Sequence, residues 1–226
     1  MNYFIYIILL SIITLLINNQ LIKKNILINI TGDRHQKFAS KIKIPLTGGI
    51  FVFLGILYFF NQSFKSLILF SFFILVLGIF SDLKLIQSAA KRFLFQITLV
   101  LSFIIFNDIQ ILDTRIILLD SLLNNNFFNY LFVTFCILIV INGSNFLDGL
   151  NTLNIGYYFL ICLIIYFLRF NNEIVLNDIS IFYFLVLFSF VFLLNLFNKF
   201  YLGDSGSYLL GFIFSVFLIY LYNSNN

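Results

Sequence analysis

The chain has 226 residues, of which 62% are hydrophobic and only 10% are charged, and its formal net charge is +4. Soluble domains are closer to half apolar and a quarter charged, so this composition excludes an ordinary soluble protein and predicts a polytopic integral membrane protein. The two cysteines, Cys136 and Cys162, lie inside apolar runs, which argues against a disulfide framework or a cysteine metal site.

A helix needs about 20 apolar residues to cross a bilayer, and the chain predicts about eight transmembrane helices in an all-α fold. In chain order they are expected at residues 2–22, 46–62, 66–81, 91–107, 128–142, 152–170, 179–198 and 206–222. The stretch near residues 108–125 is too polar to cross and predicts a small hairpin-like excursion on the outer face. One transmembrane domain, 1–226, is expected, and its first run is expected to be a retained helix rather than a signal peptide.

Eight crossings place alternate loops on opposite faces of the membrane. One face receives the loops at 23–45, 82–90, 143–151 and 199–205, and with their borders it carries ten of the 13 basic residues. These are Lys23, Lys24, Arg34, Lys37, Lys41, Lys43, Lys84, Lys91, Arg92 and Lys199. Basic loops stay in the cytoplasm, so this face is expected to be cytoplasmic. Nearly all charges lie at helix ends, which disfavours a transporter or channel.

The motif "GDSGS", Gly203 to Ser207, precedes the last apolar run. Its glycines allow a ligand to approach the backbone, and a helix starting at about Ser205 would offer free N–H groups to an anion. Asp204 beside a phosphate site would be a natural Mg²⁺ ligand. The alternative is that Asp204 or Ser205 is only an N-cap.

The loop "NGSNFLDGLNTL" carries Asn142, Asn145, Asp148 and Asn151 at intervals of three. On a helix these side chains would line one face, so that one ligand could meet several of them. Amide and carboxylate oxygens can bind Mg²⁺ or pair with a nucleotide. The alternative is a polar helix cap that ends at Gly149.

Two further polar motifs fall on the same face. "FSDLKLIQSAAKRFLFQ" places Asp82 at a helix end and the pair Lys91 and Arg92 at the next helix start, where they could neutralise phosphates or only flank the membrane. "HQKFASKIKIPLTGGI" ends in Gly48 and Gly49, which could admit a phosphate at a helix N-terminus or form a turn.

In this order and on one face, the four motifs resemble those of the polyprenyl-phosphate N-acetylhexosamine-1-phosphate transferases of glycosyltransferase family 4. "IPLTGGI" is similar to the family's Pro-x-x-Gly-Gly element, and "GIFSDL" falls where the family has two adjacent aspartates. "NGSNFLDGLN" is similar to its Asn-x-x-Asn-x-x-Asp-Gly motif, and "GDSGS" to its Gly-Asp-x-Gly-Ser motif. The resemblance covers residues 32–215 and is closer to the branch that uses UDP-N-acetylglucosamine than to the phospho-MurNAc-pentapeptide branch.

The resemblance implies a role for each motif residue. Asn145 and Asp204 would hold the cofactor Mg²⁺, and Asp82 and Asp148 would be catalytic. The other motif residues would bind the substrates: Asn142, Asn151, Lys91, Arg92, Gly48 and Gly49.

The chain departs from the family pattern at several places. Ser81 stands where the first of the two adjacent aspartates is expected, and Asn151 stands where the family often has an aspartate. The chain stops at Asn226 and has no histidine beyond His35, whereas family members usually continue into further helices and a cytoplasmic loop with a His-x-His-His element. A truncated or shortened form is therefore expected.

The resemblance implies transfer of N-acetylhexosamine 1-phosphate from a UDP-N-acetylhexosamine to polyprenyl phosphate, with release of UMP. This would be the first step of a cell-surface glycan, at the cytoplasmic face of a bacterial inner membrane. Membrane lipids are the expected surroundings, a nucleic-acid partner is not expected, and a homodimer is left open. The alternative is a truncated, inactive homologue that binds lipid phosphate or a membrane partner, which the missing C-terminal loop and the loss of an acid at Ser81 both favour.

Overall fold

The computed structural model describes residues 3–29, 43–58, 65–148, 152–169 and 178–224. Regular secondary structure in these ranges is helical, and the one extended pairing there is an isolated antiparallel bridge between Ile28 and Pro45. The helices are α1 (Tyr3–Lys24), α3 (Gly48–Leu57), α4 (Lys65–Asp82), α5 (Ala89–Asn107), α6 (Ile117–Leu123), α7 (Asn126–Leu147), α8 (Leu153–Arg169), α9 (Asp178–Leu196) and α10 (Gly203–Ser224). The predicted all-α fold is confirmed.

Five helices are long and apolar enough to cross a membrane: α1, α4, α5, α7 and α10. The apolar helices α3, α8 and α9 occupy three more of the predicted positions, but the apolar parts found there, Gly48–Leu57, Leu153–Leu168 and Ile181–Leu196, are shorter. The ten residues of α3 rise only about 15 Å, against a hydrocarbon core of about 30 Å. The chain is a membrane protein, but helix length does not support the predicted count of eight spans.

The hairpin predicted near residues 108–125 is wrong, because this stretch forms the short helix α6 and the approach to α7. Its position outside the membrane stays a prediction. Asp120 on α6 accepts hydrogen bonds from the backbone N–H of Thr114 (2.7 Å) and from its hydroxyl (2.6 Å), which fold the preceding chain onto the helix. Asn125 then caps α7 by accepting from the backbone N–H groups of Phe127 and Phe128. Asn125 thus caps α7, whereas Asp120 lies in the first turn of α6 and holds Thr114 there, and neither is a turn residue of a hairpin.

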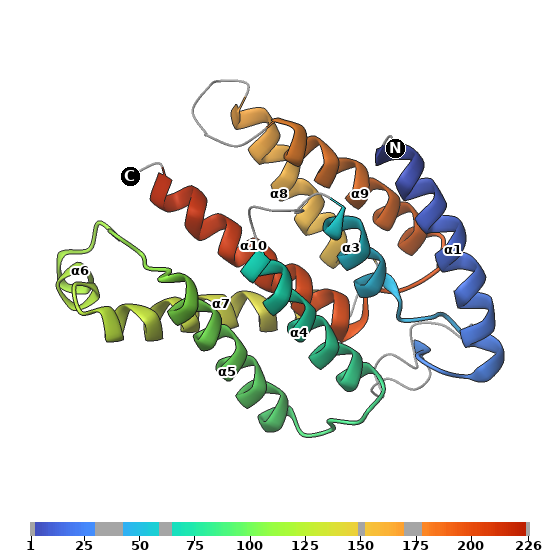
Figure 1. Cartoon of the computed structure of the whole chain (residues 1–226), viewed down its shortest axis with the longest axis horizontal. Helices are drawn as coiled ribbons and strands as arrows, with labels where there is room; N and C mark the ends of the chain where they lie inside the picture. Colours follow the sequence, from blue (N-terminus) through green and yellow to red (C-terminus); the bar gives the residue numbers. More distant parts are fainter. Residues whose placement is uncertain (1–2, 30–42, 59–64, 149–151, 170–177, 225–226) are drawn as a thin grey trace.

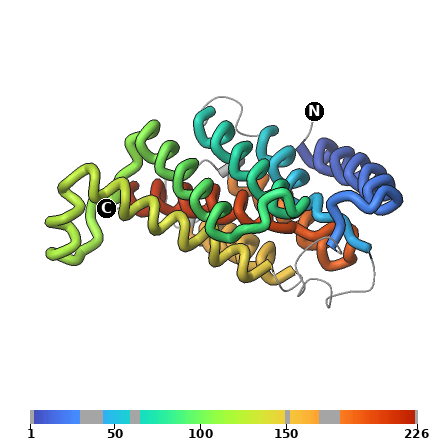
Figure 2. Tube along the Cα trace, turned by 90° about the horizontal axis from the view of Figure 1, so that it is seen from below, coloured from blue at the N-terminus to red at the C-terminus, as the bar shows by residue number. Residues whose placement is uncertain are grey.

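Helix α10 is the centre of the bundle. Figures 1 and 2 show it running through the middle; it packs mainly against α4 and α7, and α5 packs against these same two helices. In the most apolar 18-residue stretch of α10, 72% of the residues are buried inside the protein. The corresponding fraction is 22% for α1 and for α5, which lie at the periphery. Lipid is as apolar as the helices themselves, so close contact between helices requires close packing rather than exclusion of water.

Small residues bring α3 and α4 against the start of α10. A Cβ added to Gly49 would lie 2.5 Å from the backbone nitrogen of Gly206, and one added to Gly78 would overlap the backbone of Ser205. Only glycine fits where backbones approach this closely. The first turn of α10 is therefore held between α3 and α4.

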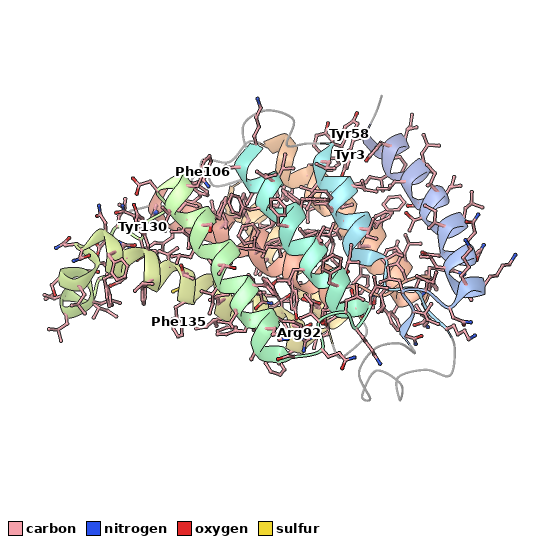
Figure 3. All side chains as sticks on the ribbon, turned by 60° about the horizontal axis from the view of Figure 1, so that its bottom comes forward. Tyr3, Tyr58, Arg92, Phe106, Tyr130 and Phe135 are labelled. Carbon is pink, nitrogen blue, oxygen red and sulfur yellow. The ribbon has the colours of Figure 1, made fainter. Side chains whose placement is uncertain are left out.

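The chain segments between helices also meet at this end of the bundle, where α4 ends and α5 and α10 begin. The backbone N–H of Gly48 donates to the Tyr201 carbonyl (2.9 Å), and the N–H of Tyr201 donates to the Pro45 carbonyl (2.8 Å). Figure 3 shows Arg92 at this end and Tyr3 and Tyr58 at the opposite one. We call it the Asp204 end, because the polar motifs of the sequence meet there.

Candidate active site

An ion pair between α5 and α10 is the centre of the candidate site. Nη1 of Arg92 lies 2.9 Å from Oδ2 of Asp204 and also donates to the hydroxyl of Ser81 at 2.6 Å. The Ser81 hydroxyl in turn donates to the same oxygen of Asp204. Arg92 and Asp204 have side chains that are 19% and 15% exposed, so the pair is accessible from the end of the bundle but shielded from bulk water.

Asp82 caps α10 from the neighbouring helix. Its carboxylate accepts hydrogen bonds from the backbone N–H of Asp204 (2.8 Å) and of Ser205 (3.1 Å). Asp82 is 4% exposed. The anion that the free N–H groups of this helix N-terminus attract is thus a carboxylate of the chain itself. The catalytic role predicted for Asp82 stays a prediction, but this contact accounts for an acid at its position.

Gly203 makes this cap sterically feasible. Its φ is +68°, in the left-handed region, and a Cβ there would lie 2.7 Å from Oδ2 of Asp82. A side chain at this position would be strained and would push the carboxylate away from the helix. The glycine that opens the "GDSGS" motif is therefore explained by the approach of Asp82.

Asp148 follows α7 and faces the first turn of α10. The side chains of Ser207 and Asn154 and the backbone of Gly203 form hydrogen bonds with its carboxyl group. Burial raises the pKa of Asp148 to about 7, the nearby charge of Asp204 raises it further, and these hydrogen bonds oppose the shift only in part. Near neutral pH, Asp148 can therefore either hold or release a proton.

The asparagines of the fifth apolar run lie on the last turns of α7. Asn142 donates to Oε1 of Gln96 on α5 (3.1 Å), and Asn145, one turn further on, is half-buried. Gln96 is 1% exposed, and its Nε2 has no hydrogen-bond partner among the described residues. The helix ends at Leu147, so the predicted single helical face holds for Asn142 and Asn145 and not beyond.

Polar residues that the motif analysis passed over support this arrangement. The hydroxyl of Ser144 donates to Asn154 (3.1 Å), the amide of Asn154 donates to Ser207 (3.2 Å), and Ser207 donates to the Gly203 carbonyl (2.8 Å). Tyr208 also forms a hydrogen bond with Ser81. Asn154 continues the spacing of three that runs from Asn142 to Asn151, and this signal could have found it.

The remaining predicted residues lie at the edge of the site or outside the described residues. Lys91 is exposed on the first turn of α5, and Ser88 caps its backbone N–H. Gly48 and Gly49 are buried against the backbone that precedes and starts α10, which accounts for glycine at both positions, and their contact with a phosphate stays a prediction. Asn151 falls in the segment 149–151, outside the described residues.

Among the described residues, no three His, Cys, Asp or Glu side chains converge closely enough to hold a metal ion by themselves. Asp204 is nevertheless close enough to Asp82 and to Asp148 for its charge to act on both. Mg²⁺ usually takes one or two carboxylates and completes its shell with water and phosphate oxygens. The donor set around Asp204 therefore fits Mg²⁺ as a partner of a bound phosphate, rather than as an ion held by protein alone.

Comparison with known proteins identifies one matching family. Residues 64–222, about two thirds of the chain, match the model of glycosyl transferase family 4. A search of curated proteins found no match. The matched range contains Ser81, Asp82, Arg92, Asp148 and Asp204, so the site assembled by the helices lies inside the family region.

Proposed function

Because the chain belongs to glycosyl transferase family 4, we propose that it transfers N-acetylhexosamine 1-phosphate from a UDP-N-acetylhexosamine to polyprenyl phosphate. UMP would be the second product. The observation that carries the proposal is the contact of Arg92, Ser81 and Asp204 at one end of a bundle of membrane helices. A cation and an acid at the end of a membrane bundle would suit a reaction between a water-soluble donor and a membrane-embedded acceptor.

The reaction exchanges one phosphorus–oxygen bond for another. An oxygen of the lipid phosphate attacks the sugar-bearing phosphorus, and the bond from that phosphorus to the bridging oxygen breaks, so that the electron pair leaves with UMP. A phosphate monoester has a second pKa of about 6 and is largely dianionic at neutral pH. The attacking oxygen therefore needs positioning and charge neutralisation more than a base, which agrees with a serine at position 81.

Arg92 is the residue best placed to neutralise phosphate charge. It uses Nη1 for both Ser81 and Asp204, and a guanidinium has five N–H donors in a planar fork. Arg92 can therefore hold Asp204 in position and donate to a phosphate with its other nitrogens. Such charge-assisted contacts to transferring phosphoryl groups are among the largest contributions to catalysis.

Asp204 and Asn145 are the proposed ligands of Mg²⁺, which when bound would offset the negative charge of the diphosphate and of the departing UMP. Asp204 is oriented for this by Ser81 and Arg92, and its backbone is fixed by Asp82. Asn145 projects from the last turn of α7. Carboxylate and amide oxygens are ligands that Mg²⁺ accepts.

Asp148 is proposed to assist on the donor side of the site. Ser207 and Asn154 fix its carboxyl group, so it can accept a hydrogen bond from the sugar or the nucleotide in one protonation state and donate one in the other. Asn142, which borders the same space from α7, is proposed to contact the donor as well.

The proposed acceptor implies where in the cell the reaction would take place. A polyprenyl phosphate keeps its chain in the bilayer and its phosphate at the surface, while a UDP-sugar is made in the cytosol. The Asp204 end would then face the cytoplasm, at the inner membrane of a bacterium, and the lipid-linked product would begin a cell-surface glycan. The excess of basic residues in the loops at this end supports that orientation.

Release of UMP tests the proposal directly. The purified chain is mixed in detergent with undecaprenyl phosphate and UDP-N-acetylglucosamine, with Mg²⁺ or with EDTA, beside Asp204→Asn. We expect release that needs both Mg²⁺ and lipid phosphate and falls roughly 10³-fold in the variant.

A matched control variant is Asp108→Asn, because Asp108 lies at the opposite end of the bundle. It should keep wild-type release. Absence of release with every UDP-N-acetylhexosamine, from protein that remains folded and monodisperse, would contradict the transferase proposal and favour a homologue that only binds lipid phosphate.

A further inference from the structure

A groove on the α1 side of the bundle lies apart from the candidate active site. Its volume is about 300 Å³, and its walls are apolar faces of α1, α3 and the end of α4, including Leu10, Leu21, Leu54 and Leu83. In Figure 1, α1 stands at the edge of the bundle beside α3, with α4 on the far side of α3. The groove runs over α3 between these two outer helices.

The position of the groove on α4 separates it from Asp204. Ile79 and Leu83 line the groove, and each is two residues from Ser81, which bonds Arg92 and Asp204. Two residues correspond to about 200° around a helix, so the groove and the candidate site use opposite faces of α4. A ligand in the groove would not displace the substrates proposed for the site.

The length of the groove matches one leaflet of a bilayer. Its wall on α1 extends from Leu10 to Leu21, a rise of about 16 Å at 1.5 Å per residue. Half of the hydrocarbon core is about 15 Å. Along this wall, Ile13 and Ile17 are 53% and 49% exposed, so an apolar chain of leaflet length would cover them.

The polar groups in the walls already have partners within the protein. The hydroxyl of Thr14 donates to the Leu10 carbonyl (2.8 Å), and the hydroxyl of Thr47 donates to Asn18 (2.8 Å). The Asn18 amide donates to the Lys199 carbonyl (3.1 Å). With these groups satisfied, the groove presents an apolar surface that suits a hydrocarbon tail rather than a polar ligand.

Lysines surround the end of the groove that lies at the membrane surface. Lys23 and Lys24 form the last turn of α1, two residues beyond Leu21, and Lys84 follows Leu83 directly. All three side chains are exposed, and Lys43 lies close by, with its amine 2.6 Å from the side-chain oxygen of Asn25. Juxtamembrane basic residues attract anionic lipid head groups.

We propose that this groove binds an anionic phospholipid of the bilayer, with one acyl chain between α1 and α4 and its phosphate among Lys23, Lys24 and Lys84. The bound lipid would complete the packing of α1, which otherwise contacts the bundle through α3 and α9. The site is distinct from that of the lipid substrate and does not depend on transfer activity.

Native mass spectrometry of the full chain tests the proposal. Protein in detergent is incubated with equal amounts of phosphatidylglycerol, phosphatidylcholine and undecaprenyl phosphate, and the retained lipids are counted. We expect preferential retention of phosphatidylglycerol, reduced about fivefold for each lysine replaced by glutamine. The control is Lys65→Gln, an exposed lysine at the other end of α4.

A second pair of variants tests the groove itself. Ile17→Trp should fill it and abolish phosphatidylglycerol retention, whereas Ile5→Trp, at a residue that is 50% exposed on α1 outside the groove, should not. Equal retention of the two phospholipids, or retention unchanged by the lysine replacements or by Ile17→Trp, would overturn the proposal. So would undecaprenyl phosphate that displaces phosphatidylglycerol from the wild type and is itself no longer retained by Ile17→Trp, since the substrate would then occupy the groove.

Discussion

Asparagines and aspartates lie at both ends of the bundle, but they form different kinds of contact at each end. At the end where α6 lies, which we call the α6 end, Asn129 bonds the backbone of Ile111 and Leu123, and Asn223 donates to the Gln110 carbonyl (2.7 Å). These amides form hydrogen bonds with backbone groups that have no partner within a helix. At the Asp204 end, Asp82 also bonds the backbone, but Arg92, Ser81 and Asp204 bond one another through their side chains, and charges lie side by side in partly buried positions.

The acids of the two ends titrate in opposite directions. At the α6 end, the hydroxyl of Tyr130 lies 2.5 Å from Asp108 and lowers the pKa of that acid, and Thr114 similarly lowers the pKa of Asp120. At the Asp204 end, burial and the charge of Asp204 raise the pKa of Asp148. A raised pKa in a cluster of carboxylates is a mark of a functional site, and a lowered one at an exposed cap is a mark of structure. The presence of polar residues alone would not distinguish the end that carries the candidate site from the α6 end.

After Asp204→Asn, replacing Arg92 by glutamine should give the largest effect, a loss of roughly 10² in the rate of UMP release. Asp204 would lose its cationic partner, and the substrate phosphates would lose a charged donor. Lys91→Gln changes the neighbouring exposed residue by the same charge and should cost only a few-fold. The two variants are compared at saturating Mg²⁺, and equal losses would mean that net charge, not the contact with Asp204, matters.

Gly49→Ala should destabilise the protein by about 2 kcal/mol, because its Cβ would lie 2.5 Å from the backbone of Gly206 and would force α3 away from α10. Gly143→Ala is the matched control, since a Cβ there meets nothing within 4 Å. Thermal unfolding in detergent measures both. If both variants unfold at the wild-type temperature, close packing of α3 on α10 is not what requires glycine.

The pH dependence of stability should report Asp148. Its pKa is raised in the fold to about 7 from an ordinary value of 3.8, so folding favours the protonated acid. Stability should fall as pH rises from about 4 to 7 and level off above 7, by on the order of 4 kcal/mol in total. Thermal unfolding in EDTA measures this decline.

In Asp148→Asn, the loss of stability that is due to ionisation of Asp148 should be absent. The stability of the variant should therefore change less with pH than that of the wild type. A variant profile that falls as steeply as the wild-type one would assign the titration to another group.

Asp108→Asn should give the smallest effect. The change replaces an exposed acid at the α6 end whose partners are Tyr130 and Gln110, and exposed contacts of this kind contribute little. We expect UMP release within about twofold of wild type. A loss comparable to that of Arg92→Gln would remove the distinction between the two ends.

The helices and the membrane setting could be predicted from the sequence, because apolar runs are long and the polar motifs interrupt them clearly. The meeting of the motifs at one end followed from counting alternate loops. The partner of Asp82 could not be predicted, since its bonds to the backbone of Asp204 and Ser205 depend on how two distant helices pack. The hairpin expected near residues 108–125 is wrong because Asp120, from inside the short helix α6, accepts hydrogen bonds from Thr114, local bonds that composition does not predict.

Gln96 shows a different limit. Gln96 lies four residues, or about one helical turn, after Arg92 on α5. This spacing could suggest that Gln96 is buried and bonds Asn142. The absence of a partner for its Nε2 could not be predicted in this way, because that depends on which side chains of other helices pack around it. Sequence reasoning therefore located the walls of the site but not which buried donors lack a partner.

The capping of α10 by Asp82 has a consequence for biogenesis. Asp82 leaves the ribosome more than a hundred residues before Asp204 and Ser205, the residues whose N–H groups it accepts. Until α10 enters the bilayer, Asp82 ends its helix without these partners, and Ser81 and Arg92 have no Asp204 to bind. The site is completed in a single late step, when the middle helix of the bundle is inserted, so partly synthesised chains would have no assembled site.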